Sequence, residues 1–305
     1  CLVGSEMCIR DRIQAAEKYP DVQFCHATGT QAHTKNLKNF HNAFASIYEG
    51  RYLAGIAAGM KLNAMIKEGK FEAKDAKIGY VGAYPYAEVK SGYTAFFLGV
   101  RSVCKEATME VQFTGSWYDE AKEKEAATLL IGRGCKLISQ HADSMGAPTA
   151  CESAGVPNVS YNGSTLDACP NTFIVSSRIN WVPYMKYMIE CVRDNKAIDT
   201  DWCKGINEGA VELTPINEKV AAPGTAEAIK AAEEQFKAGT LHVFDTSTFT
   251  VDGKTLTSYM ADVDTDEKFT PDTEVVSNGY FHESEKRSAP YFDVNIDGIT
   301  LLNEG

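Results

Sequence analysis

Lys77-Ile-Gly-Tyr-Val-Gly-Ala-Tyr84 is the stretch that decides the fold, because it is a short apolar run, typical of a buried strand, that ends in a polar loop. A helical pattern follows over residues 88–103, and the same alternation then continues along the chain. Further strands are predicted at 108–113, 136–140 and 157–162, with helices over 120–132 and after residue 144. Short apolar runs that alternate with helical patterns predict a parallel α/β sheet.

The carboxyl ends of these strands carry aromatic and polar residues in place of plain turn residues. In parallel α/β sheets, ligands bind outside the carboxyl ends of the strands. Tyr84 and Trp117 offer flat apolar faces, each with one polar tip, that suit stacking on a ring or a sugar. Asp143 accepts hydrogen bonds, whereas Asn162 both accepts and donates them. The sequence therefore predicts a binding site formed by Tyr84, Trp117, His141, Asp143, Ser144, Tyr161 and Asn162.

Three of these residues also have a purely structural interpretation. Trp117 alone fits a cap on the sheet edge equally well, and Asp143 and Asn162 are typical of helix N-caps or turns. Trp181 and Trp202 are predicted to belong to the core. A binding site is favoured over these structural roles because four successive strand ends carry aromatic or polar residues.

No catalytic residue, metal ligand or cofactor is predicted. The segment His141-Ala-Asp143-Ser144 contains the residue types of a catalytic triad, but neighbours in one loop do not form a relay by adjacency alone. The chain has no G-x-G-x-x-G, no P-loop and no G-x-S-x-G elbow. The histidines at 26, 33 and 41 are too widely spaced for one helix face, and the nine cysteines form no C-x-x-C motif, so a zinc site is not expected.

Composition narrows the class of protein. The 305 residues, 44% of them hydrophobic, suffice for a large core and one or two domains. A formal charge of -11 argues against a nucleic-acid partner, because such proteins usually carry a basic face. No run of about 18 apolar residues is present, so no segment is expected to span a membrane. The scattered cysteines fit either a cytosolic protein or an exported protein of an anaerobe.

The first twelve residues, Cys1-Leu-Val-Gly-Ser-Glu-Met-Cys-Ile-Arg-Asp-Arg12, do not match the pattern of the rest of the chain and lack a signal-peptide pattern. We interpret residues 1–12 as a non-native scar and exclude them from the fold. The native N-terminus is then expected to be missing.

Six motifs occur in order along the chain: Phe24-Cys-His-Ala-Thr28, Tyr48-Glu-Gly-Arg-Tyr-Leu-Ala-Gly55, Lys77-Ile-Gly-Tyr-Val81, Gly115-Ser-Trp-Tyr-Asp119, Gln140-His-Ala-Asp-Ser144 and Asn180-Trp181. Together they resemble the basic membrane protein (Bmp) family, which consists of substrate-binding lipoproteins of ABC importers similar to the purine nucleoside receptors. The resemblance runs from about Ile13 to at least Phe244.

This resemblance implies a type I periplasmic-binding-protein fold, in which two Rossmann-like parallel-sheet lobes are joined by a hinge. Compared with the family, lobe 1 is expected to be truncated at its N-terminal side. The implied division is lobe 1 at 13–75, lobe 2 at 76–177, a return segment to lobe 1 at 178–215, a lobe 2 helix and hairpin at 216–250, and a C-terminal tail at 251–305.

The resemblance adds Asn180 to the candidate ligand-binding residues, and the chain departs from the family at two positions. Asn162 stands where many relatives have an aspartate that binds ribose hydroxyls. Ile179 lies near the position where the nucleoside receptors have a lysine. These departures weaken the preference for a nucleoside and leave room for a free purine base.

The family implies an extracytoplasmic receptor, either periplasmic or a cell-surface lipoprotein, that closes on a purine nucleoside or base. Its partners would be the ABC permease subunits, and a lipid anchor on the missing N-terminus would be its membrane attachment. Two alternatives remain: a nucleoside-processing enzyme on the same scaffold, and the ligand-sensing module of a regulator.

Overall fold

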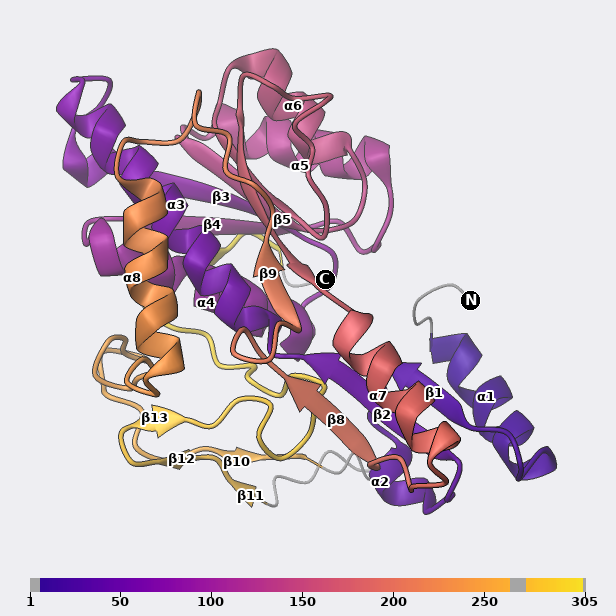
Figure 1. Ribbon diagram of the computed structural model, residues 1–305. Coiled ribbons are helices and arrows are strands. Elements are labelled where there is room, and N and C mark those ends of the chain that lie inside the picture. The colour runs from indigo at the N-terminus through magenta and orange to yellow at the C-terminus, as the bar shows by residue number, and fades with distance from the viewer. Residues whose placement is uncertain (1–5, 264–272, 304–305) are drawn as a thin grey trace.

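A seven-stranded sheet forms the centre of the larger of two lobes in the computed structural model, which describes residues 6–263 and 273–303 (Figure 1). All neighbouring strands of this sheet are parallel except β7 (Phe173–Ile179) and β9 (Val211–Leu213), which are antiparallel. In spatial order the strands are β14 (Ile299–Leu301), β4 (Thr108–Phe113), β3 (Lys77–Gly82), β5 (Leu137–His141), β6 (Asn158–Tyr161), β7 (Phe173–Ile179) and β9 (Val211–Leu213). The predicted parallel α/β sheet is thus confirmed.

Helices cover both faces of this sheet, so a central strand such as β3 is buried on both faces. Ile78, Tyr80 and Val81 of β3 are all fully buried, although neighbouring side chains on a strand point to opposite faces. On one face lie α3 (Ile47–Lys67), α4 (Ala87–Val103) and α8 (Thr225–Lys237), and on the other lie α5 (Glu120–Gly132) and α6 (Gly146–Ala154).

Close contact between α3 and α4 depends on two glycines. A Cβ atom placed on Gly55 would lie 2.1 Å from the carbonyl oxygen of Phe96, and one on Gly99 would lie 2.0 Å from that of Tyr52. Only a residue without a side chain therefore permits this approach of the two backbones.

Because α3 packs on the large sheet, the structure differs here from the predicted division, which placed residues 13–75 in the small lobe.

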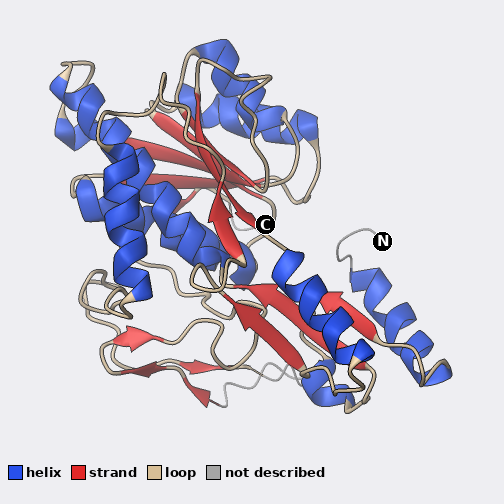
Figure 2. Ribbon diagram, in the orientation of Figure 1, coloured by secondary structure: helices blue, strands red, loops and turns tan. Residues whose placement is uncertain are grey.

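The smaller lobe contains a three-stranded parallel sheet, seen at the lower right of Figure 2. Trp202, expected in the core, is 5% exposed and packs on Tyr184 of α7 (Val182–Arg193), with a ring separation of 4.9 Å. The strands, in spatial order, are β1 (Phe24–Ala27), β2 (Phe40–Ala45) and β8 (Asp201–Lys204). The remaining helical elements of the chain are α1 (Glu6–Lys18), α2 (Ala32–Lys35) and the 3-10 helix η1 (Ala73–Asp75).

Two further details differ from the prediction. Strand β8 was not predicted, and of the segment 178–215 only α7 and β8 lie on the small sheet, because β9 returns to pair with β7 of the large sheet. Helix α1 begins at Glu6, so the boundary expected at residue 12 falls within a helix.

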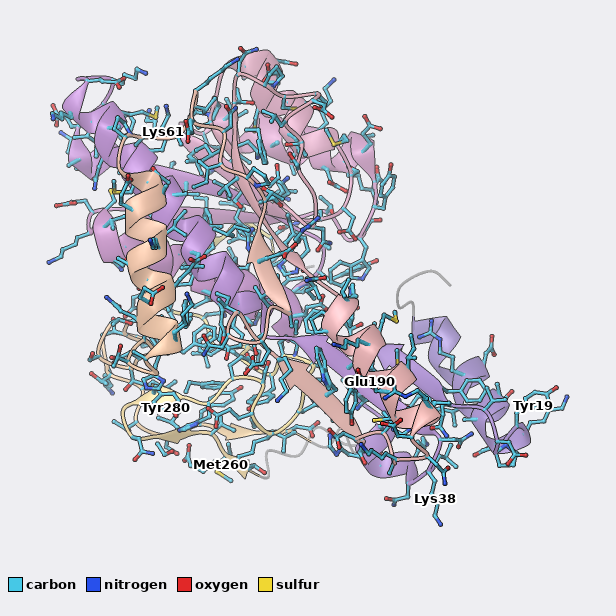
Figure 3. The ribbon with its side chains drawn as sticks, in the orientation of Figure 1. Tyr19, Lys38, Lys61, Glu190, Met260 and Tyr280 are labelled. Carbon is cyan, nitrogen blue, oxygen red and sulfur yellow. The ribbon has the colours of Figure 1, made fainter. Side chains whose placement is uncertain are left out.

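The chain crosses between the lobes at β2 to α3, at β7 to α7, and at β8 to β9. Figure 3 shows Tyr19, Lys38 and Glu190 on the small lobe, far from Lys61 on α3 in the large lobe. Several crossing segments between two sheets form the hinge that the resemblance implied.

The C-terminal segment is part of the main core, not a loose tail. Phe292 stacks on Phe244 with a ring separation of 4.3 Å and lies 4.8 Å from the ring of Phe281. Val251 and Lys254 form an isolated antiparallel bridge that closes a turn. Two short antiparallel strand pairs complete the segment, β10 (Met260–Ala261) with β11 (Thr273–Glu274), and β12 (Val276–Ser277) with β13 (Tyr280–Phe281). Residues 264–272 of the predicted C-terminal tail lie outside the described residues.

Candidate functional site

A row of aromatic rings lines the carboxyl edge of the large sheet. Tyr84, after β3, lies 5.7 Å from Trp117, after β4, measured between ring centroids. Trp117 lies 6.3 Å from His141 at the end of β5, and His141 lies 4.1 Å from Tyr161 at the end of β6. Parallel strands bring their carboxyl ends to one edge, and side chains distant in sequence meet there for this reason.

Two polar side chains lie beside this row. The amide of Asn162 donates a hydrogen bond of 2.9 Å to Oδ1 of Asp143, and both residues are exposed. The backbone N–H of Asp143 donates to the carbonyl of Trp117 at 2.9 Å, so the loops after β4, β5 and β6 are joined. The structure therefore brings Tyr84, Trp117, Asp143, Tyr161 and Asn162 together at one edge.

His141 forms the buried back wall of this edge. Its side chain is fully buried, and neither ring nitrogen has a hydrogen-bond partner among the described residues. A Cβ atom on Gly92 of α4 would lie 2.4 Å from its Nδ1, so the ring is clamped between α4 and Tyr161. Burial lowers the pKa of His141 well below its usual value, and the nearby Arg51 cation lowers it further. The imidazole is therefore neutral at pH 7.

Glu88 on the first turn of α4 is a charged group that sequence reasoning missed. Its Oε1 lies 4.0 Å from Nε2 of His141. Burial raises the pKa of Glu88 to about 7, and the carboxylate of Asp143 raises it further. This carboxyl group is therefore about half protonated at pH 7. It lies beside the exposed Asp143–Asn162 pair.

Ser144 and Asn180 have structural partners instead of free polar groups. The backbone N–H of Ser144 donates to the buried carboxylate of Glu123 at 3.2 Å, and its Oγ accepts a bond from the N–H of Gly146 at the start of α6. Asn180 donates from Nδ2 to the carbonyl of Gly209 and accepts the N–H of Val182 at Oδ1. Both side chains therefore serve as caps or turn supports in this structure.

Arg51 is a second residue that sequence reasoning missed. It lies fully buried on α3, and its guanidinium donates to Oγ of Ser139 at 2.7 Å and to the hydroxyl of Tyr80 at 3.0 Å. Its charged carbon lies 5.6 Å from the ring centroid of Tyr161. No carboxylate forms an ion pair with it within the described ranges. The signal in the sequence that could have revealed this residue is an arginine inside a helix of small apolar residues.

The triad residue types of the loop after β5 form no relay. In the part of the chain that the structure describes, His141 has no hydrogen-bond partner, Asp143 bonds to Asn162, and Ser144 bonds to Gly146. A nucleophilic serine requires a hydrogen bond to its base.

Metal-binding geometry and membrane-spanning length are also not found in the described residues. Over 6–263 and 273–303, no three His, Cys, Asp or Glu side chains converge as a metal ion requires. In the same ranges, no helix combines the length and apolar character that crossing a membrane demands.

Comparison with known proteins identifies the relatives of this chain. Residues 6–241 match the Bmp family model, described as "ABC transporter substrate-binding protein PnrA-like". A purine-binding protein of Brucella abortus is 30% identical over 226 residues, which are 72% of this chain and 60% of that protein. A putative ABC transporter glucose-binding protein of Haloferax volcanii is 33% identical over 235 residues, which are 77% of this chain and 56% of that protein.

Solved structures agree on the fold. An ABC transporter solute-binding protein from Aeropyrum pernix superimposes with a TM-score of 0.66 at 16% identity, over 79% of this chain and 75% of that one. The chain spans less than two thirds of the length of the two relatives named above. Since the family model covers most of the chain, the protein belongs to the Bmp family of PnrA-like ABC transporter substrate-binding proteins.

Proposed function

We propose that the protein is an extracytoplasmic receptor that binds a purine nucleoside or a purine base at the carboxyl edge of the large sheet and delivers it to an ABC permease. The observation that supports this most is the row of Tyr84, Trp117 and Tyr161 beside the Asp143–Asn162 pair. The purine-binding protein of Brucella abortus is a relative with a named ligand of this class.

The two parts of the edge would recognise different parts of such a ligand. An indole and a phenol ring provide flat apolar faces for a heterocycle, and a stacked aromatic pair contributes about 0.5–1.5 kcal/mol beyond its buried area. Asp143 has one carboxylate oxygen bonded to Asn162, so its other oxygen is available to a hydroxyl or a ring N–H. Affinity then comes from stacking and orientation from the polar pair.

Closure of the two lobes would hold the ligand. Ligand contacts that span both lobes shift the population toward the closed form, with the crossing segments as hinges. A receptor of this kind releases its ligand unchanged, so no turnover is expected. Incubation with inosine should yield no hypoxanthine.

A sugar is the second candidate ligand, because the Haloferax volcanii relative is named as a putative glucose-binding protein. Aromatic faces beside a carboxylate and an amide also suit the hydroxyls of a sugar. The presence of a neutral Asn162 is compatible with both ligands.

Calorimetric titration with adenosine, guanosine, hypoxanthine and glucose separates these possibilities. A purine nucleoside or base should bind one-to-one, and the same ligand should raise the melting temperature by mass action. Binding of glucose alone would reassign the ligand class, and loss of the purine with formation of new products would reassign the protein to the enzymes.

A further inference from the structure

Glu88, on the first turn of α4, carries a carboxyl group without a hydrogen-bond donor among the described residues. Nε2 of His141 lies 4.0 Å from its Oε1, which is beyond hydrogen-bond distance. The side chain is 23% exposed, and neither oxygen is among the unpaired polar atoms that are shut off from solvent. Both oxygens are therefore accessible to a ligand.

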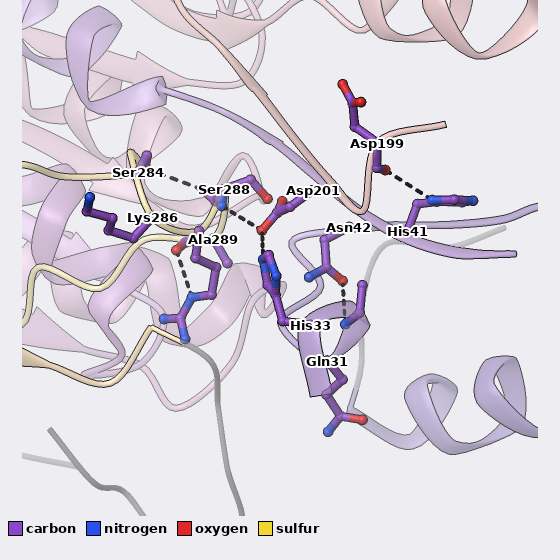
Figure 4. A network of polar contacts seen from close by, with 12 residues as sticks. Gln31, His33, His41, Asn42, Asp199, Asp201, Ser284, Lys286, Ser288 and Ala289 are labelled. Carbon is purple, nitrogen blue, oxygen red and sulfur yellow. Dashed lines mark hydrogen bonds and ion pairs between the residues drawn. The ribbon is translucent and has the colours of Figure 1, made fainter. Parts of the chain in front are cut away.

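Other enclosed carboxyl groups of the protein have donors. Glu123 accepts the backbone N–H of Ser144 at 3.2 Å. Asp201 accepts that of Ser288 at 3.0 Å, as Figure 4 shows. Polar groups that are largely enclosed by protein are nearly always hydrogen-bonded. At Glu88, a bound ligand is the group that can supply the missing partner.

Glu88 lies beside the row of rings at the sheet edge. The ring of His141, its neighbour, is 4.1 Å from that of Tyr161 and 6.3 Å from that of Trp117. Helix α4 is pressed against the end of β5, because a Cβ atom on Gly92 would lie 2.4 Å from Nδ1 of His141. The carboxyl group is thus held next to the surface on which a flat ligand would stack.

The surroundings of Glu88 favour an uncharged carboxyl group. Burial first, and then the nearby carboxylate of Asp143, raise its pKa to about 7. His141 is neutral, and burial raises the pKa of Tyr161 well above its usual value, so neither offers a positive charge. The cation of Arg51 lies 5.6 Å from the ring centroid of Tyr161 and is hydrogen-bonded to hydroxyl groups. A ligand that displaces water from the edge favours the neutral form further.

A neutral carboxylic acid suits one edge of a purine. It has an O–H donor and a carbonyl acceptor side by side. Adenine has the complementary pair, an amino N–H next to a ring nitrogen, and hypoxanthine has a ring N–H next to a carbonyl oxygen. The amides of asparagine and glutamine, which also combine a donor and an acceptor, pair with adenine through two hydrogen bonds.

We propose that Glu88 is a specificity-determining residue of the purine site and binds the base as a carboxylic acid. Its O–H donates to a ring nitrogen or carbonyl of the base, and its carbonyl oxygen accepts the adjacent N–H. Where Glu88 is ionised in the free protein, binding takes up one proton from the buffer. This role rests on the proposed function, and it deepens that function by naming the edge of the base that is recognised.

The test is calorimetric titration of the full chain with adenine, hypoxanthine and unsubstituted purine, each as the free base and as its ribonucleoside. Unsubstituted purine keeps the ring nitrogens of adenine but lacks its amino group. It should bind at least about tenfold more weakly than the better of the other two, because a site that hydrogen-bonds an N–H rejects the analogue without it.

Proton uptake is measured with the tightest of these ligands at pH 7, in phosphate and in Tris, two buffers with different enthalpies of ionisation. About 0.5 proton should be taken up per ligand, because about half of Glu88 is ionised in the free protein at this pH. Affinity should stay level below about pH 6 and fall above pH 7, by up to about tenfold per pH unit.

Two variants separate binding from a structural role. Glu88→Ala should weaken binding by about tenfold or more, because both hydrogen bonds to the base are lost. Glu88→Gln keeps a donor and an acceptor, so it should recover most of that affinity and take up no proton. Glu125→Ala, at an exposed position on α5, is the matched control and should take up as much proton as the parent. The melting temperature shows that each variant is folded.

Failure of all six compounds to bind would overturn the proposed function, and this role of Glu88 with it. If a purine binds, the role of Glu88 alone is overturned by proton release, or by the absence of proton exchange, at pH 7. It is also overturned if Glu88→Gln takes up the same proton as the parent, since another group such as Asp143 would then titrate. Should Glu88→Ala not fold, the proton count of Glu88→Gln decides.

Discussion

The side-chain amide of Asn162 donates a hydrogen bond of 2.9 Å to the carboxylate of Asp143, and so joins the loops that follow β6 and β5. Asn162 has a φ of 64°, a left-handed conformation that asparagine tolerates better than most residues. The backbone N–H of Asp143 in turn bonds to the carbonyl of Trp117. Three loops from three strands are therefore held as one surface.

Trp117→Ala should weaken binding of the purine ligand by at least about tenfold, because stacking and the buried area of the indole are both lost. The measurement is the Kd by calorimetry. Tyr118→Ala is the matched control, since Tyr118 is the next residue in the same loop and its side chain is 67% exposed. Equal affinities for the two variants would remove Trp117 from the site.

Asn162→Ala should weaken ligand binding by about three- to tenfold, because Asp143 loses the donor that orients it. Alanine also strains a left-handed backbone by about 1–2 kcal/mol. Asn162→Gly removes the same amide without this strain, so the glycine variant should be more stable than the alanine variant and bind just as weakly. Full affinity in the glycine variant would show that backbone conformation, and not the hydrogen bond, matters.

The strands of the large sheet could be predicted because their signal is local. The apolar pattern alone predicts a strand at residues 108–113, which form β4. Strand β8 was missed because Asp201-Trp-Cys-Lys204 is short and has no regular alternation. The position of α3 was also missed, since it depends on Gly55 meeting Phe96, a contact between residues far apart in sequence.

The candidate site was predicted only in part, again because some of its contacts join residues far apart in sequence. Strand topology alone places Trp117, Asp143 and Asn162 at one edge. Whether a polar side chain is free depends on its neighbours, and this explains why Ser144 and Asn180 proved to be engaged by Gly146 and Gly209. Charged residues that act from a neighbouring helix, such as Arg51, have no strand-end pattern to reveal them.

Glu88→Gln should change how stability depends on pH. Burial raises the pKa of Glu88 from 4.5 to about 7, so the folded protein binds more protons than the unfolded chain between these values. The free energy of unfolding therefore falls as pH rises from about 4.5 to about 7, and it levels off above pH 7. For one group this fall is at most about 1.4 kcal/mol per pH unit.

Removal of this carboxyl group should flatten that fall and stabilise the protein at pH 8, where the parent must bury a charge. The measurement is the free energy of unfolding, obtained by denaturant titration of both proteins at pH 5, 6, 7 and 8. Glu125→Gln, at an exposed position on α5, should keep the slope of the parent. Parallel curves for Glu88→Gln and the parent would refute the assignment. Glu49, whose pKa burial also raises to about 7, contributes a fall of the same sign that persists in both proteins.

Gly55→Ala should destabilise the protein by about 2 kcal/mol or more, because its Cβ would lie 2.1 Å from the carbonyl oxygen of Phe96 and rigid backbone must move. Gly132→Ala is the matched control. Gly132 ends α5, and a Cβ there meets no atom within 4 Å, so its higher helix propensity should stabilise by up to about 1 kcal/mol. Urea denaturation at constant pH gives both values. Similar small changes for the two variants would mean that α3 and α4 are not in close backbone contact.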